Sequence, residues 1–192
     1  MPRPVPFRRP APAELDAALG RTIPDVIRPG LDVLFCGINP GRHSGATGFH
    51  FAGPGNRFWK ALRDGGFTER VLLPSESRAL LDVGCGITNL VARTTANAAE
   101  LSGEELRAGR RRLERMVRRY RPRLVAVAGV SAYRQAFERP GATPGPQPED
   151  LAGARLWVLP NPSGLNASYQ AADFAAWFRS LRQDAGTARR EG

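Results

Sequence analysis

The chain has 192 residues, of which 42% are hydrophobic and 24% charged, so it is long enough for one globular domain with a sizeable core, which argues against wholesale disorder. Its formal net charge of +10 favours a polyanionic partner, nucleic acid before a membrane surface, although a GC-rich genome would also enrich arginine. The two cysteines form no Cys-x-x-Cys pair and there are only two histidines, which argues against a disulfide framework, a zinc or iron–sulfur site and a histidine-rich metal site.

The first 24 residues are rich in proline and arginine and are expected to form a basic, flexible arm with a short helix at residues 13–19. The N-terminus has no apolar segment like that of a secretory signal, and no apolar run is long enough to span a membrane. We therefore expect a cytoplasmic protein with no membrane partner. One domain is expected over residues 25–183, followed by a flexible tail at residues 184–192.

The first predicted strand, residues 31–36, is an apolar run that ends in the turn Gly-Ile-Asn-Pro-Gly at residues 37–41. A buried strand that stops in such a turn delivers the backbone to the carboxyl edge of a sheet, where open α/β sheets bind ligands. The glycines permit close approach of a ligand, Pro40 stiffens the turn, and Asn39 is held as an uncharged donor and acceptor. Taken alone, these five residues fit an ordinary strand-ending turn better than a binding site.

A glycine-rich loop is predicted at residues 41–51, with the size typical of a binding loop, and a helix at residues 56–65. Residues 80–91 fit either a second strand or a buried loop. A capping box formed by Ser102 and Glu105 then opens an amphipathic helix rich in arginine. We interpret its basic face as a solvated surface, with phosphate contact as the minority interpretation.

Residues 124–129 are predicted as a buried strand and residues 131–137 as a short helix. Residues 139–150, rich in proline and glycine, are predicted as a loop. The last strand, at residues 155–160, runs directly into a second rigid turn at residues 160–166, and a helix at residues 169–181 closes the chain.

Strands that alternate with helices predict an α/β fold, a three-layer αβα sandwich with a central, mainly parallel β-sheet. Since both rigid turns follow parallel strands, they are expected to face one another at the carboxyl edge of that sheet. One turn presents an amide close to the aromatic ring of Phe51, and the other presents a small polar residue and an apolar tip. This combination suits a planar heterocycle held in a pocket, with an apolar side chain replacing it in a nucleic-acid duplex.

Other chemistries have weaker support. Neither G-x-G-x-x-G nor a P-loop pattern occurs, so the dinucleotide and P-loop interpretations are weak. Gly129-Val130-Ser131 is similar to the start of a nucleophile elbow but lacks its second glycine. Both histidines also precede this serine, which argues against a hydrolase triad.

Four segments together resemble the mismatch-specific uracil/thymine DNA glycosylases of the uracil-DNA glycosylase superfamily: residues 37–41, 47–51, 55–59 and 161–165. The resemblance extends in order over residues 25–182 and implies a uracil-DNA-glycosylase-like fold. It implies a monofunctional, bacterial, nucleoid-associated enzyme that acts as a monomer without a cofactor. Its partner would be double-stranded DNA with G:U or G:T mismatches. The enzyme would flip out uracil, with thymine and damaged or modified pyrimidines as further substrates, and hydrolyse the N-glycosidic bond to leave an abasic site for base excision repair.

Carried over residue by residue, Asn39 matches the catalytic asparagine that positions the attacking water, and Phe51 matches the aromatic that stacks on the flipped base. The base pocket implied by the resemblance comprises Ile38, Ser44, His50, Phe51, Asn89, Thr95 and Asn161. The segment implied to enter the duplex and contact the widowed guanine comprises Ser163, Gly164, Leu165 and Asn166. No metal site is implied.

The chain departs from the bacterial relatives at two places. They carry lysine where this chain has Asn89, and Ser-Arg after the wedge leucine where it has Asn166-Ala167. Two other functions stay open: a catalytically weak or inactive duplex-DNA-binding module of the same fold, and a nucleotide-binding enzyme that acts on free nucleosides. The second of these would need neither the wedge turn nor the positive charge.

Overall fold

The computed structural model describes residues 7–164 and 168–187, and its centre is a five-stranded sheet in the order β2-β1-β3-β5-β4. The strands are β1 (Val33–Gly37), β2 (Cys85–Asn89), β3 (Leu124–Ala128), β4 (Gly145–Leu151) and β5 (Ala154–Leu159). The first three and β5 pair in parallel, and β4 is antiparallel to β5. The prediction of a mainly parallel sheet is therefore confirmed.

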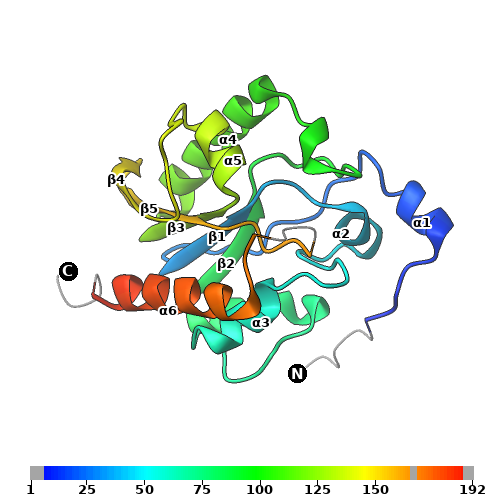
Figure 1. Ribbon diagram of the computed structural model, residues 1–192, viewed down its shortest axis with the longest axis horizontal. Coiled ribbons are helices and arrows are strands. Elements are labelled where there is room, and N and C mark those ends of the chain that lie inside the picture. Colours follow the sequence, from blue (N-terminus) through cyan, green and yellow to red (C-terminus); the bar gives the residue numbers. More distant parts are fainter. Residues whose placement is uncertain (1–6, 165–167, 188–192) are drawn as a thin grey trace.

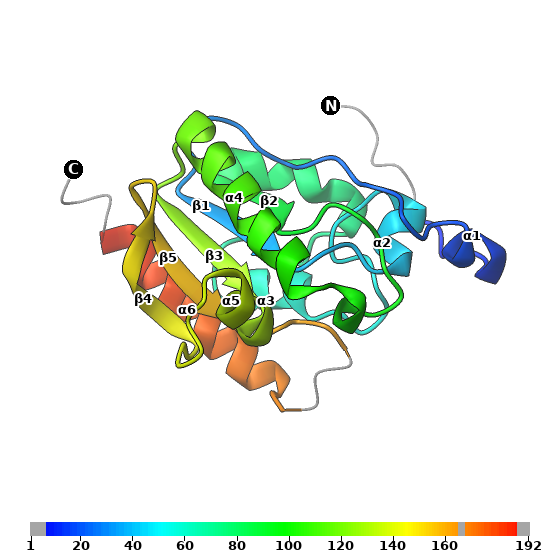
Figure 2. The same cartoon turned by 90° about the horizontal axis from the view of Figure 1, so that it is seen from above.

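Helices cover both faces of this sheet, as the three-layer prediction requires (Figure 1). One face is covered by α4 (Gly103–Tyr120) and α5 (Val130–Ala136), which lie over the strands in Figure 2, and the other by α3 (Phe58–Asp64) and α6 (Ala171–Thr187). The remaining short elements are α1 (Pro12–Asp16), α2 (Arg42–Thr47), and the 3₁₀ helices η1 (Pro74–Val83) and η2 (Ala98–Glu100). Among the described residues, no helix combines the length and apolar character needed to cross a membrane.

Strands β1 and β3 are apolar throughout because each is buried on both faces. In β1, Phe35 points to a cluster with Phe58 and Phe178, whereas Leu34 points to the opposite cluster with Leu113. Because helices pack on both faces of the sheet, both sides of such a strand must be apolar. This explains why continuous apolar runs in the sequence predicted buried strands. Both cysteines are buried, and burial raises the pKa of the Cys36 thiol.

The prediction of a loop at residues 41–51 is wrong for its first half, which forms α2. The helix begins after Gly41, which has extended backbone, and ends at Gly48, whose φ of 78° is left-handed. Within it, the Thr47 hydroxyl donates to the His43 carbonyl over 2.8 Å. The glycines in this stretch therefore bound a short helix instead of extending a loop.

The prediction of a loop at residues 139–150 is also wrong from Gly145 onward, because β4 forms there at the edge of the sheet. Pro146 and Pro148 lack the N–H group that a central strand would have to donate, and only an edge position tolerates them. The pairing with β5 is irregular between Pro146 and Asp150. Proline content alone thus hid an edge strand.

Several boundaries differ from the predicted ones. The first helix covers Pro12–Asp16 instead of residues 13–19, and residues 80–91 contain the end of η1 followed by β2. The N-terminal segment is anchored before residue 25, since the Gly20 amide donates to the Thr94 carbonyl over 3.0 Å. Next to it, Val26 forms an antiparallel bridge with Ile87 of β2.

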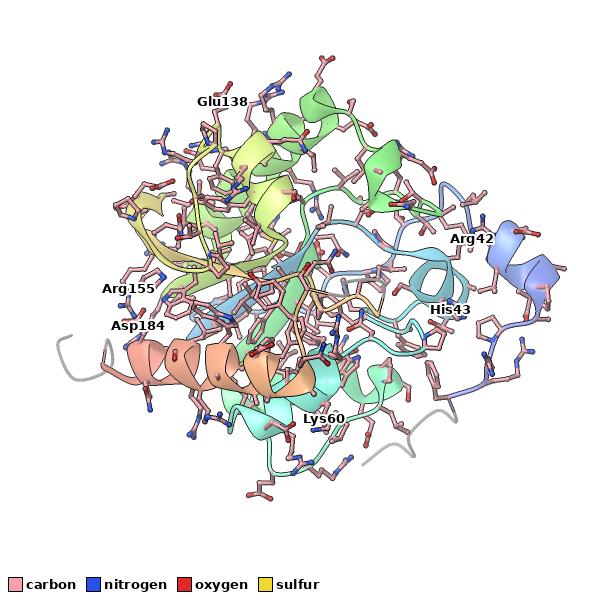
Figure 3. The ribbon with its side chains drawn as sticks, in the orientation of Figure 1. Arg42, His43, Lys60, Glu138, Arg155 and Asp184 are labelled. Atoms are coloured by element: carbon pink, nitrogen blue, oxygen red, sulfur yellow. The ribbon has the colours of Figure 1, made fainter. Side chains whose placement is uncertain are left out.

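At the other end, α6 continues to Thr187, past residue 183 where the sequence placed the end of the domain. The Asp184 carboxylate accepts hydrogen bonds from Arg155 Nη1 at 2.8 Å and from Trp157 Nε1 at 2.6 Å. Figure 3 shows Arg155 and Asp184 meeting where the end of α6 passes β5. These long-range bonds, which no local pattern predicts, fasten the end of the helix to the sheet.

Candidate functional site

A cleft of about 1120 Å³ lies at the carboxyl edge of the parallel strands, the edge marked by α2 in Figure 1. The next strand after β1, β2, pairs with one side of β1, and the strand after that, β3, pairs with the other side. The cleft lies at this switch point, where open α/β sheets bind ligands. Its walls contain every described residue of the predicted site: Ile38, Asn39, Ser44, His50, Phe51, Asn89, Thr95, Asn161, Ser163 and Gly164. The predicted Leu165 and Asn166 lie outside the described residues.

Asn39 lies directly after β1, and its side-chain amide is fixed by three acceptors. Its Nδ2 donates to Thr95 Oγ1 at 2.7 Å, to the Arg93 carbonyl at 3.0 Å and to the Pro40 carbonyl at 3.2 Å. No described residue donates to its Oδ1. The amide therefore has a defined orientation in which its oxygen is available as an acceptor at the wall of the cleft.

Thr95 lies at the wall of the cleft and also holds the turn after β1. It is buried, its hydroxyl accepts from Asn39, and its backbone amide donates to the Pro40 carbonyl at 3.1 Å. A further backbone bond joins Leu90 to the Gly37 carbonyl at 2.9 Å. The segment after β2 thus continues alongside the turn after β1, and Thr95 serves that turn by holding the amide of Asn39.

Phe51 forms an aromatic wall of the cleft. Its ring stacks on Phe58 of α3, with centroids 4.0 Å apart and an interplanar angle of 23°. Its backbone φ of 52° is left-handed, a conformation that costs a non-glycine residue free energy and that the surrounding packing must impose. One face of this ring is therefore supported from behind by Phe58, in the manner required of a platform for a planar ligand.

His50 and Asn89 form a buried polar pair beside this ring. His50 Nε2 lies 3.0 Å from the Pro24 carbonyl, which can only accept, so Nε2 carries the proton and Nδ1 accepts from Asn89 Nδ2 at 3.2 Å. Burial lowers the pKa of His50 and favours this neutral form. Asn89 Oδ1 lies beside Gly37, and a Cβ added to Gly37 would lie 2.5 Å from this oxygen.

The remaining predicted residues complete the walls. Ser44 is buried in α2, and its hydroxyl oxygen accepts from the Ala52 amide at 3.2 Å. Ile38 packs over Gly129, where a Cβ would lie only 2.7 Å from the isoleucine Cδ1. In the segment after β5, Asn161 Oδ1 accepts from the Ser163 amide at 3.0 Å, which closes a turn of the kind asparagine favours.

Sequence reasoning did not identify Arg57 as a support for the wall of this cleft, although it lies within one of the motifs that carry the resemblance. Its guanidinium donates to the carbonyls of Ser163, at 2.6 Å, and Tyr169, at 2.5 Å. These contacts join residues more than a hundred positions apart, so no local pattern points to them. Two other arginines, Arg42 and Arg134, line the cleft itself and add positive charge to it.

In the two described stretches, no three His, Cys, Asp or Glu side chains are grouped so that they could hold a metal ion. The groups that the cleft offers are neutral amides, hydroxyls, a neutral imidazole and an aromatic ring, with arginines at its walls. Such a set binds a neutral planar ring by stacking and hydrogen bonds, and an attached anion by charge.

Two comparisons with known proteins agree with this geometry. The family model described as the uracil DNA glycosylase superfamily matches residues 24–185. A solution NMR structure of a candidate uracil DNA glycosylase from Methanosarcina acetivorans superposes with a TM-score of 0.56 at 19% sequence identity. The match covers 85% of this chain and 99% of that one, and at this identity it shows the fold alone.

Proposed function

The chain belongs to the uracil DNA glycosylase superfamily, and from this premise we propose that it excises uracil mispaired with guanine in double-stranded DNA, with thymine and modified pyrimidines as further substrates. The observation that carries the proposal is the fixed amide of Asn39, whose oxygen is presented in the same cleft as the supported ring of Phe51. This pair offers one group for water and one platform for a base.

In this mechanism Phe51 stacks on the flipped pyrimidine and Asn39 holds water close to the sugar C1′. An asparagine is not a strong base, so the rate depends on departure of the base more than on activation of water. The transition state would resemble an oxocarbenium ion, as in glycoside hydrolysis, without the usual carboxylate pair. Backbone N–H groups near Ile38 and Phe51 would stabilise the departing base anion, each contributing about 3 kcal/mol.

The orientation of Asn89 supports a pyrimidine with a hydrogen at N3. Its Nδ2 is oriented by the bond to His50, and its Oδ1 is an acceptor that a ligand donor can use. Uracil and thymine carry an N3–H donor, whereas cytosine has an acceptor at that position. We therefore expect discrimination against cytosine, and the buried Ser44 beside the pocket is proposed to influence whether the 5-methyl group of thymine fits.

DNA binding and mismatch preference complete the proposal. Extruding a base costs a few kcal/mol and costs least at a mismatch, which favours G:U over A:U pairs. Residues 163–166 are proposed to enter the space that the base vacates, with Leu165 as the wedge and Asn166 near the widowed guanine. Arg42 and Arg134 would contact phosphates.

The test uses the wild-type protein and the Asn39→Ala variant on duplexes carrying uracil, thymine or modified pyrimidines opposite guanine or adenine. Strand cleavage at abasic sites after alkali measures base release, and fluorescence anisotropy measures binding. We expect the wild type to release uracil fastest opposite guanine, and Asn39→Ala to bind equally well but react at least about a hundredfold more slowly. Full activity of Asn39→Ala would reject the assigned role, and wild-type binding without any product would favour the inactive DNA-binding module.

A further inference from the structure

Arg57, the residue immediately before α3, donates hydrogen bonds to three backbone carbonyls of the segment that follows β5. Its backbone amide donates to Pro162 at 3.0 Å, its Nη2 to Ser163 at 2.6 Å and its Nη1 to Tyr169 at 2.5 Å. The guanidinium also lies 4.5 Å from the centroid of the Phe174 ring in α6. The half-buried side chain of Arg57 thus holds the backbone at two positions, Ser163 and Tyr169.

The segment held by Arg57 also packs closely against the loop before α3. A Cβ at Gly164 would lie 3.1 Å from the Gly55 carbonyl oxygen, so the two backbones are nearly in contact. The loop itself is fixed, since the Asn56 amide donates to Gly53 at 3.1 Å and Asn56 Oδ1 caps the Phe58 amide at 3.0 Å. Arg57 therefore holds the turn against a rigid support.

The next residue, Phe58, supports the aromatic wall of the cleft. Its ring is the one on which Phe51 stacks, and its side chain is fully buried in the core. Arg57 and Phe58 are therefore neighbours in the sequence, and they contact two different walls: Phe58 packs on the ring of Phe51, and Arg57 bonds to the segment at Ser163. The start of α3 therefore links the position of Phe51 to the position of the segment at Ser163.

We infer that Arg57 is a positioning residue that fixes the wall at Ser163 and Gly164 relative to Phe51, and that this is required for duplex substrates but not for single-stranded ones. The inference rests on the proposed function, in which that wall contacts the duplex while the base pocket alone does the chemistry. A guanidinium suits the task because its planar fork reaches two carbonyls at once, which the single ammonium of lysine does not do.

The test compares Arg57→Met, Arg57→Lys and a matched control, Arg63→Met, on the same uracil placed opposite guanine in a duplex and in a single strand. Arg63 lies on the same helix, is about half exposed and pairs only with its neighbour Asp64 in the described residues. In single-turnover assays we expect Arg57→Met to lose about tenfold or more on the duplex and less than about twofold on the single strand. Arg57→Lys should be intermediate, and Arg63→Met should match the wild type. Equal losses on both substrates, or no loss on the duplex, would overturn the inference.

A second measurement is independent of catalysis. Amide hydrogen exchange in peptides covering residues 160–170 of the free protein is expected to be faster in Arg57→Met than in the wild type or in Arg63→Met. Unchanged exchange overturns the inference whatever the enzymatic result. A wild-type protein inactive on both substrates, with exchange still raised in Arg57→Met, would instead overturn the proposed function and leave the role of Arg57 in holding this wall.

Discussion

Two asparagine side chains of the cleft, Asn39 and Asn89, each have their Nδ2 group engaged by neighbours. In both, the oxygen is the atom left for a ligand or water. Because amides do not titrate, their orientation depends on hydrogen-bond partners alone. The chemistry of the site is therefore decided by residues such as Thr95 and His50, which orient an amide without needing to contact the substrate.

Gly37 is the residue where this arrangement has least room. A Cβ there would lie 2.5 Å from Asn89 Oδ1 and 3.3 Å from Phe51 Cζ, so Gly37→Ala must displace the amide and the ring. We expect a loss of about tenfold or more in the rate of uracil release and a destabilisation of about 1–3 kcal/mol. Gly141→Ala is the matched control, since nothing lies within 4 Å of its added Cβ. Wild-type kinetics for Gly37→Ala would show that Asn89 and Phe51 need no fixed position.

The burial of His50 leads us to expect that the free energy of unfolding depends on pH. Burial lowers its pKa in the folded protein below the ordinary value of 6.5, at which the unfolded chain titrates. Below that value the unfolded state binds more protons than the folded state, so the free energy of unfolding falls as the pH is lowered through about 6.5. Urea unfolding at about pH 7 and about pH 5.5 should show a smaller loss for His50→Gln than for the wild type. His43→Gln, which changes the half-buried histidine of α2, should keep most of the wild-type dependence, and identical losses in all three proteins would contradict the prediction.

At the scale of secondary structure elements, the sequence predicted those with a repeating apolar pattern and missed those decided by distant contacts. The strands at β1, β3 and β5 were predictable because burial on both faces requires uninterrupted apolar runs. The helix α2 and the strand β4 were not, because glycine in one and proline in the other are also the residues of loops. Asn39 and Phe51 could be placed in a shared site from their motifs, but the contacts of Arg57 arise only in the folded chain.

The end of α6 gives a prediction for stability. Asp184 accepts hydrogen bonds from the half-buried Arg155 and from the indole of Trp157, which is 3% exposed. Asp184→Ala leaves the buried indole N–H without this acceptor, so we expect the protein to lose about 1–3 kcal/mol of unfolding free energy. Chemical denaturation measures the loss. Asp82→Ala, which removes an exposed carboxylate, is the control and should change stability little, and an equal effect of the two changes would argue against a role for the indole bond.

Over the whole molecule, the net charge of +10 predicts DNA binding that weakens with salt. Each arginine that contacts a phosphate contributes about one to the slope of log affinity against log salt concentration. We expect Arg42→Ala and Arg134→Ala, which change the cleft, each to reduce that slope by about one. Arg182 lies at the opposite end of the parallel strands, near the start of β1 and β2, so Arg182→Ala should leave the slope unchanged. Equal slopes for all variants would place the bound DNA away from the cleft.

The two lateral edges of the sheet carry a different consequence. At one side, the bridge between Val26 and Ile87 occupies the outer backbone of β2, and at the other, β4 ends the sheet with Pro146 and Pro148. An incoming strand from a second molecule would meet occupied carbonyls on one flank and missing donors on the other. Both edges are thus guarded against strand addition, and a strand that paired with β2 at Ile87 would first have to displace the N-terminal segment at Val26.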